Sequence, residues 1–201
     1  MSDDLLVLDA DGVILDYHEG YALAWERAFG HRPQIRNPDG YHPRDYWDVP
    51  VLAGEELRHF WTVGFDEELW RSMPALPGAA EACRLLRDAG HRLVCVTALG
   101  PEFEAARTAN LRELGLEFEA VHAVGHQGAG NPKQAALDRL RPAAFVDDYL
   151  PYLQGIGDRT WRGLIDARSH ASPNRDPELE APHSRHPDLQ EFADWWVRRG
   201  A

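Results

Sequence analysis

The sequence is poor in the features that mark disulfide-rich, membrane and secreted proteins. It has only two cysteines, Cys83 and Cys95, both inside apolar segments, so it shows neither a disulfide framework nor a zinc-ligand spacing. No apolar run approaches the roughly 18 residues of a membrane span, so we expect no membrane partner. The acidic start, Met1–Asp4, lacks the basic and apolar regions of a signal peptide, which favours a cytoplasmic location.

Positive charge is also scarce in this chain. Lys and Arg together number 21 against 33 Asp and Glu, which gives a net charge of −12. Lys133 is the only lysine. Such a chain is poorly suited to bind nucleic acid or an anionic membrane surface. It can still bind a small phosphorylated molecule, because a local cation overrides the global field.

Most of the sequence alternates between strand-like and helix-like patterns. A length of 201 residues suffices for one domain with its own core. Parallel βαβ units follow from strands separated by helices of this length, so we predict an α/β fold with a three-layer, Rossmann-like parallel sheet. The expected strands cover residues 5–8, 92–97, 118–124, 143–147 and 162–165, and the expected helices 79–88, 101–114, 132–140 and 187–199.

Residues 17–73 have a different pattern. They contain no convincing buried strand, and helical spacing is present over 21–29, 55–61 and 67–73. Eleven of the twenty aromatic residues lie between Tyr17 and Trp70. We interpret this segment as a small α-helical cap whose aromatics mostly form its own core. The predicted domains are therefore residues 1–16 with 74–201 as the α/β core, and residues 17–73 as the cap.

The segment at 169–185 is rich in Ser, His, Pro, Asn and Arg, which is typical of a polar loop. It includes His183, and His186 follows directly after it. Two histidines at this spacing can hold a metal ion weakly, but we interpret both as belonging to a solvated loop.

The first strand ends in two closely spaced carboxylates. Asp9 and Asp11 follow the apolar run Leu5–Leu8, and Gly12 comes next. Carboxylates at the end of a buried strand cost stability unless something binds there. The natural compensator is a hard cation such as Mg²⁺, which prefers oxygen ligands. In open α/β sheets this edge is also where ligands bind.

Three later segments place further polar residues at strand ends. Thr97 ends an apolar strand, and its hydroxyl with the amides of the following turn suits phosphoryl oxygens. Lys133 opens a predicted helix, and Asp147 and Asp148 end another strand. We therefore expect four carboxylates, one cation and one hydroxyl at one edge of the sheet. This set suits a Mg²⁺-assisted reaction on a phosphate.

Taken in order, these residues resemble the motifs of the haloacid dehalogenase-like hydrolase superfamily. Its first motif is D-x-D-G-x-x-x-D, which is matched by Asp9, Asp11, Gly12 and Asp16. Its second is a Thr or Ser that ends an apolar strand, its third a Lys ahead of the last core strand, and its fourth an acidic pair that ends that strand. These three are matched by Thr97, Lys133, Asp147 and Asp148.

The resemblance implies a role for each residue. Asp9 would be the nucleophile that takes the phosphoryl group as an aspartyl-phosphate, and Asp11 the general acid and then the base. Thr97 would hold phosphoryl oxygens, and Lys133 would neutralise charge between the phosphate and Asp9. Mg²⁺ would be held by Asp9, the backbone carbonyl of Asp11, Asp148 and, directly or through water, Asp147. The implied activity is that of a Mg²⁺-dependent phosphatase acting on a small phosphorylated metabolite.

Three positions bear on the type of reaction. The dehalogenases of the superfamily lack an acid at the position of Asp11, because a halide needs no proton, so its presence favours phosphoryl chemistry. Ala98 follows Thr97 where many relatives have Asn or another small polar residue. Tyr152 stands where many carry Asp or Asn. Both departures affect the surroundings of the metal or the substrate.

The substrate is less determined by the sequence. Thr97 and Ala98 are candidate contacts from the core, and the candidates from the helical segment are His18, Tyr21, His42, Arg44 and Arg58. Two other functions remain open: a sugar phosphomutase of the same superfamily, and a non-catalytic binding protein on this scaffold. We expect a monomer or a homodimer.

Overall fold

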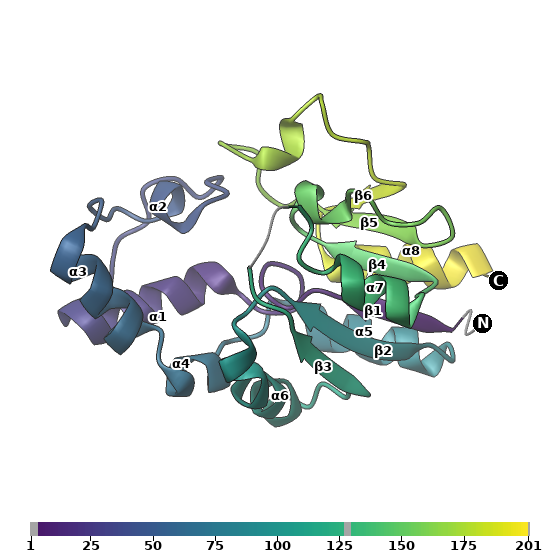
Figure 1. The fold of residues 1–201 in the computed structure, drawn as a ribbon, viewed down its shortest axis with the longest axis horizontal. Helices are drawn as coiled ribbons and strands as arrows, with labels where there is room; N and C mark the ends of the chain where they lie inside the picture. The colour runs from purple at the N-terminus through teal and green to yellow at the C-terminus, as the bar shows by residue number, and fades with distance from the viewer. Residues whose placement is uncertain (1–3, 127–129, 201) are drawn as a thin grey trace.

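The computed structural model describes residues 4–126 and 130–200. Residues 1–3, 127–129 and 201 of the predicted core, which include most of the acidic start, lie outside the described residues. A six-stranded sheet forms the centre, in the order β3-β2-β1-β4-β5-β6 with every pair parallel (Figure 1). Its strands are β1 (Leu5–Leu8), β2 (Arg92–Thr97), β3 (Ala120–Ala123), β4 (Ala144–Asp147), β5 (Trp161–Ile165) and β6 (Ser184–His186).

Helices cover both faces of the sheet, which explains why its central strands are continuously apolar. Leu6 and Leu8 of β1 pack with one set of helices, and Leu5 and Val7 point to the opposite face. The first set is α5 (Ala79–Asp88), α6 (Glu104–Glu113) and α8 (Leu189–Gly200), whereas α7 (Gln134–Leu140) and the 3₁₀ turn Leu150–Leu153 cover the other face. The predicted three-layer α/β fold is confirmed.

The helical segment, residues 17–73, lies beside the end of the sheet where β1 leads into α1 (Figure 1). Asp16 caps the first helix, because its Oδ1 accepts a hydrogen bond of 3.0 Å from the amide of Glu19. This cap explains why the helix begins at Tyr17, four residues before the predicted start. The elements are α1 (Tyr17–Phe29), α2 (Pro43–Tyr46), α3 (Gly54–His59), a π-helical turn (Phe60–Gly64) and α4 (Glu67–Arg71).

Aromatic side chains form the core of the helical segment. The ring of Phe60 lies 5.0 Å from Tyr21, 5.5 Å from Trp25 and 5.4 Å from Phe65, measured between ring centroids. All four rings are buried. Pairs at these separations add to the free energy of burial. For these residues the predicted role of the aromatics as the segment's own core is confirmed.

The prediction of a loop at 169–185 is wrong for its last two residues, because β6 begins at Ser184 and pairs with β5. The solvated interpretation of His186 is also wrong. His186 is buried, and its ring contacts the carboxylate of Glu191. A strand of three residues is too short for an alternating pattern to be recognised. Among the described residues, no helix combines the length and apolar character needed to cross a bilayer.

Candidate active site

The carboxyl ends of β1 and β4 bring three predicted carboxylates together. The two strands are neighbours, and the amide of Asp9 donates to the carbonyl of Val146 at 2.9 Å. Asp147 and Asp148 follow directly. One oxygen from each of Asp9, Asp147 and Asp148 lies within 4.8 Å of the others. Because β2 borders β1 on its other side, Thr97 lies at the same edge.

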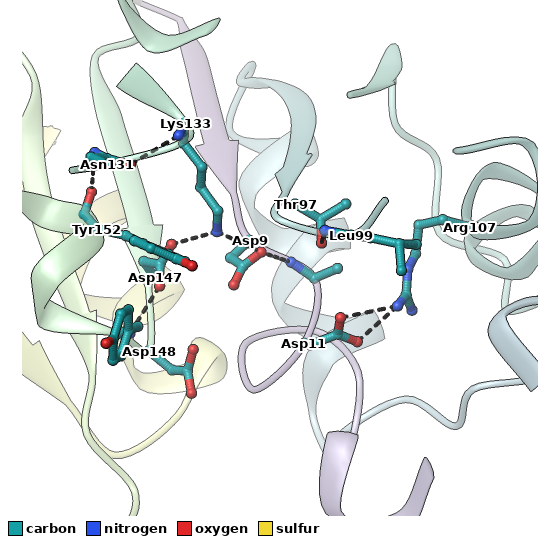
Figure 2. A network of polar contacts seen from close by, with 12 residues as sticks. Asp9, Asp11, Thr97, Leu99, Arg107, Asn131, Lys133, Asp147, Asp148 and Tyr152 are labelled. Atoms are coloured by element: carbon teal, nitrogen blue, oxygen red, sulfur yellow. Dashed lines mark hydrogen bonds and ion pairs between the residues drawn. The ribbon is translucent and has the colours of Figure 1, made fainter. Parts of the chain in front are cut away.

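Lys133 lies between two of these carboxylates, as Figure 2 shows. Its Nζ is 2.8 Å from Oδ1 of Asp9 and 2.6 Å from Oδ2 of Asp147. The lysine side chain is completely buried. Burial alone would lower the pKa of Lys133, but Asp147 and Asp9 outweigh it and raise that pKa, so the ammonium stays charged.

The site holds more negative charge than Lys133 neutralises. Burial raises the pKa of Asp147 to about 7, even though Lys133 opposes the shift. Burial, together with the carboxylates of Asp147 and Asp9, raises the pKa of Asp148 well above its usual range. A divalent cation bound by these oxygens would remove that repulsion. The three carboxylates of Asp9, Asp147 and Asp148 therefore fit Mg²⁺.

The loop after β1 passes very close to Asp148, and Gly12 makes this approach possible. Gly12 has a φ of 84°, in the left-handed region that favours glycine. A Cβ atom built on it would lie 2.4 Å from Oδ2 of Asp148. The glycine of the first motif is therefore needed both for its backbone conformation and for the space it leaves.

Asp11 turns away from Lys133 and pairs with a residue that the sequence did not single out. Nη2 of Arg107, on α6, lies 2.9 Å from Oδ1 and 3.0 Å from Oδ2 of Asp11 (Figure 2). Arg107 is 0% exposed. Burial and the charge of Asp9 outweigh this guanidinium and raise the pKa of Asp11. The direction of this shift is the one that a proton-carrying carboxyl requires.

The burial of Arg107 on α6 explains why it needs a partner. Ala106 and Leu111 are buried on α6, and Arg107 and Asn110 lie among the buried residues of the same helix. An arginine at a buried position of a helix requires a partner, because unpaired buried charge is costly. Its guanidinium also lies 5.4 Å from the ring of Trp70, so Arg107 links the core to the helical segment.

Two further residues hold Asp148 and were not anticipated. The hydroxyl of Tyr41, from the helical segment, donates to Oδ2 of Asp148 at 3.3 Å. The side-chain amide of Asn174 donates to the backbone carbonyl of Asp148 at 2.8 Å. Tyr41 lies between α1 and α2, and Asn174 lies in the 3₁₀ turn Pro173–Arg175. Both are far from the motifs in sequence, so sequence patterns could not assign them to the site.

A cavity of about 620 Å³ opens over the acidic residues, between the helical segment and the sheet. The predicted residues Asp9, Asp11, Thr97, Ala98, Asp148, His18 and His42 line it. Tyr21 is buried in the aromatic core, and neither it nor Arg44 nor Arg58 is among the lining residues. Tyr152 also lines the cavity, and its ring lies 5.0 Å from Nζ of Lys133.

A family model described as haloacid dehalogenase-like hydrolase matches residues 4–150. The chain belongs to this family. No curated protein sequence matches it.

Solved structures show the same fold in members with different chemistry. An L-2-haloacid dehalogenase from Xanthobacter autotrophicus, with chloropropionic acid covalently bound, is 15% identical, with a TM-score of 0.59 over 98% of this chain and 99% of that one. A family hydrolase from Deinococcus radiodurans with bound phosphate and sodium is 16% identical, with a TM-score of 0.63 over 98% and 96%. D,D-heptose 1,7-bisphosphate phosphatase from Burkholderia thailandensis is 18% identical, with a TM-score of 0.52 over 96% and 98%.

Replacing the buried arginine tests its pairing with Asp11. We expect Arg107→Met to lower the free energy of unfolding by about 3 kcal/mol, because it leaves a partly buried carboxylate unpaired. The loss should be smaller when Asp11→Asn is already present, since no charge is then abandoned. Urea denaturation of the wild type, the two single variants and the double variant measures the coupling free energy between Arg107 and Asp11. Additive effects would contradict the pairing.

A matched control for that cycle is available on the surface. Arg71 pairs with Glu113 at 2.7 Å, and both side chains are more than half exposed. Arg71→Met should lower the free energy of unfolding by less than about 1 kcal/mol, because solvent screens an exposed pair.

The raised carboxyl pKa values predict opposite pH trends with and without Mg²⁺. In EDTA, Asp147 and Asp148 hold protons more tightly when folded, so their contribution to stability is present at low pH and is lost as the pH rises. For Asp147 the loss is centred at a pH of about 7. Mg²⁺ requires the ionised carboxylates, so the rise in Tm that it produces should be larger at pH 8 than at pH 5. Scanning calorimetry in EDTA and in excess Mg²⁺ measures both trends.

The control variants separate the site from general charge effects. Asp148→Asn should lose most of the Mg²⁺-dependent rise in Tm, whereas the exposed Asp158→Asn should keep it. A wild-type protein whose Tm is insensitive to Mg²⁺ at every pH would contradict a cation site at these carboxylates.

Proposed function

We propose that this protein is a Mg²⁺-dependent phosphohydrolase that transfers the phosphoryl group of a small monoester to Asp9 and then to water. The observation that carries the proposal is the clustering of Asp9, Asp147 and Asp148, whose oxygens lie within 4.8 Å of one another, beside the buried Lys133, which contacts Asp9 and Asp147. Such a cluster favours a hard cation beside the nucleophile, and phosphate is the substrate whose charge that cation would offset.

The negative charge of the site must be offset before the Asp9 carboxylate can approach an anionic phosphate monoester. Asp9 and a phosphate monoester repel each other, and Lys133 offsets part of that repulsion through its contact with Asp9. We infer that Asp9, Asp148, the carbonyl of Asp11 and Asp147 hold Mg²⁺. When bound, the metal supplies positive charge to the phosphoryl oxygens and to the attacking carboxylate. Thr97 lines the same cavity, and we infer that its hydroxyl serves the phosphoryl oxygens.

The proposed reaction has two steps, transfer of the phosphoryl group to Asp9 and its hydrolysis by water. An oxygen of Asp9 attacks phosphorus, the bond from phosphorus to the alcohol oxygen breaks, and Asp11 gives its proton to that oxygen. A water molecule next attacks phosphorus while Asp11 takes its proton. The bond between phosphorus and Asp9 breaks, which releases inorganic phosphate and restores both carboxyl groups.

The presence of Asp11 favours phosphoryl transfer over displacement of a halide. Displacement of a halide by Asp9 would use neither a proton donor nor the acidic cluster. A phosphomutase would return the phosphoryl group to a sugar, so release of phosphate alone from a panel of sugar phosphates counts against it. A non-catalytic binding protein would have no need of Asp9, Asp11 and Lys133 together.

Replacing the nucleophile tests the proposal. Asp9→Asn should lower turnover of para-nitrophenyl phosphate in Mg²⁺ by roughly a thousandfold or more, because the amide is a poor nucleophile. EDTA should abolish wild-type turnover, and added Mg²⁺ should restore it. Release of para-nitrophenolate measures the rate.

The control is an Asp→Asn substitution at Asp16, the last aspartate of the first motif. Asp16→Asn should keep near-normal turnover, because Asp16 caps α1 and asparagine caps helices equally well. Circular dichroism confirms that both variants fold. Wild-type rates in a folded Asp9→Asn protein would overturn the mechanism.

A further inference from the structure

Aromatic residues form a large part of the lining of the cavity into which Asp9 opens. On one side, four neighbouring rings line the cavity: Trp61, Phe65, Trp70 and Phe103. Their consecutive centroid distances are 4.8, 5.0 and 5.9 Å. Three of these residues come from the helical segment, and Phe103 comes from the turn after β2.

A second group of rings lines the cavity near Asp148. Tyr41 and Tyr149 are stacked, with centroids 6.5 Å apart, and Tyr152 meets Tyr149 edge-on at 4.7 Å. Figure 2 shows Tyr152 and Asp148 on one side of Asp9, with Leu99 and Thr97 on the other. Both groups of rings therefore line the same cavity as Asp9.

Two tyrosine hydroxyls and one histidine ring of the cavity lining already have partners. The Tyr41 hydroxyl donates to Asp148, and the Tyr152 hydroxyl lies 3.0 Å from Nδ1 of His126. The ring of His18 contacts the carbonyl of Gly40 at 3.2 Å, and burial, followed by the charge of Arg168, lowers its pKa to about 4. Hydroxyls of a bound sugar that lie against these three groups would have to displace their contacts, and unpaired polar groups are costly to bury.

We propose that the alcohol part of the substrate is a flat aromatic group, so that the preferred substrate is a phosphate monoester of an aryl-bearing alcohol. A ring inserted between these side chains gains stacking and edge-to-face contacts and needs no hydrogen-bond partner of its own. The inference rests on the proposed phosphohydrolase activity. It disfavours sugar phosphates, including those that a mutase would use.

The comparison must hold the leaving group constant, because phenols leave more readily than alkyl alcohols. 2-Naphthylmethyl phosphate and glucose 6-phosphate both release a primary alcohol. We expect kcat/KM for the naphthylmethyl ester to exceed that for the sugar ester by at least tenfold. Equal or higher kcat/KM for glucose 6-phosphate would overturn the aromatic assignment and leave the proposed function standing.

Variants of Trp61 test whether this ring is responsible for the preference for an aromatic ester. Trp61 is 48% exposed, so its truncation should leave the fold intact. Trp61→Ala should raise KM for the naphthylmethyl ester several-fold with little effect on glucose 6-phosphate, and Trp61→Phe should restore most of the loss. Val51→Ala, at an exposed position of the same segment outside the cavity lining, should change neither value. Unchanged KM values in Trp61→Ala would contradict the role of this wall.

A binding measurement separates this inference from the proposed function. Calorimetric titration with 2-naphthylmethylphosphonate and with methylphosphonate, in Mg²⁺, requires no turnover. We expect Kd for the naphthylmethyl compound to be at least tenfold lower. If no ester is hydrolysed but this difference is present, the phosphohydrolase proposal fails and the aromatic site stands. Equal Kd values would overturn the aromatic site.

Discussion

The contact of one buried lysine with two carboxylates is the interaction on which the rest of the site depends. Lys133 is the only lysine of an acidic chain, and it lies between Asp9 and Asp147 where solvent does not reach. Its charge is stable there only because both carboxylates face it, and they in turn depend on its charge. Asp148 adds a charge that the lysine does not offset, and this imbalance makes the sheet edge a place for a cation.

A second buried cation divides the two carboxylates of the first motif. Asp9 and Asp11 are two residues apart, yet one contacts Lys133 and the other contacts Arg107. Different partners give the two groups different electrostatic surroundings, which is what a nucleophile and a proton carrier require. Arg107 also packs against Trp70, so the orientation of Asp11 is tied to the helical segment above it.

The fold and the charged centre could be predicted from the sequence because their signals are local or ordered. Continuous apolar runs marked the buried strands, and the parallel arrangement brought Asp9, Thr97 and Asp147 to one edge. The partners of these residues could not be predicted in this way. Arg107 lies 96 residues from Asp11, and Tyr41 lies 107 residues from Asp148, so only tertiary packing shows that they meet.

In the helical segment, too, the sequence predicted the elements but not their tertiary contacts. Its helices and its aromatic core followed from spacing, but which rings face the cavity did not. Tyr21 and Trp61 are both aromatic and lie on neighbouring helical elements. One is buried in the core of the segment, and the other lines the cavity. Helical periodicity over such short elements does not distinguish these two orientations.

Trapping the covalent intermediate tests the central claim most directly. Borohydride reduces an acyl phosphate to an alcohol, so quenching the protein with borohydride during turnover of a phosphate ester in Mg²⁺ should convert Asp9 to homoserine. Peptide mass spectrometry should find this change at residue 9 alone, and EDTA should prevent it. Steady release of phosphate with no modification at Asp9, or with modification at another residue, would contradict the role of Asp9 as the nucleophile.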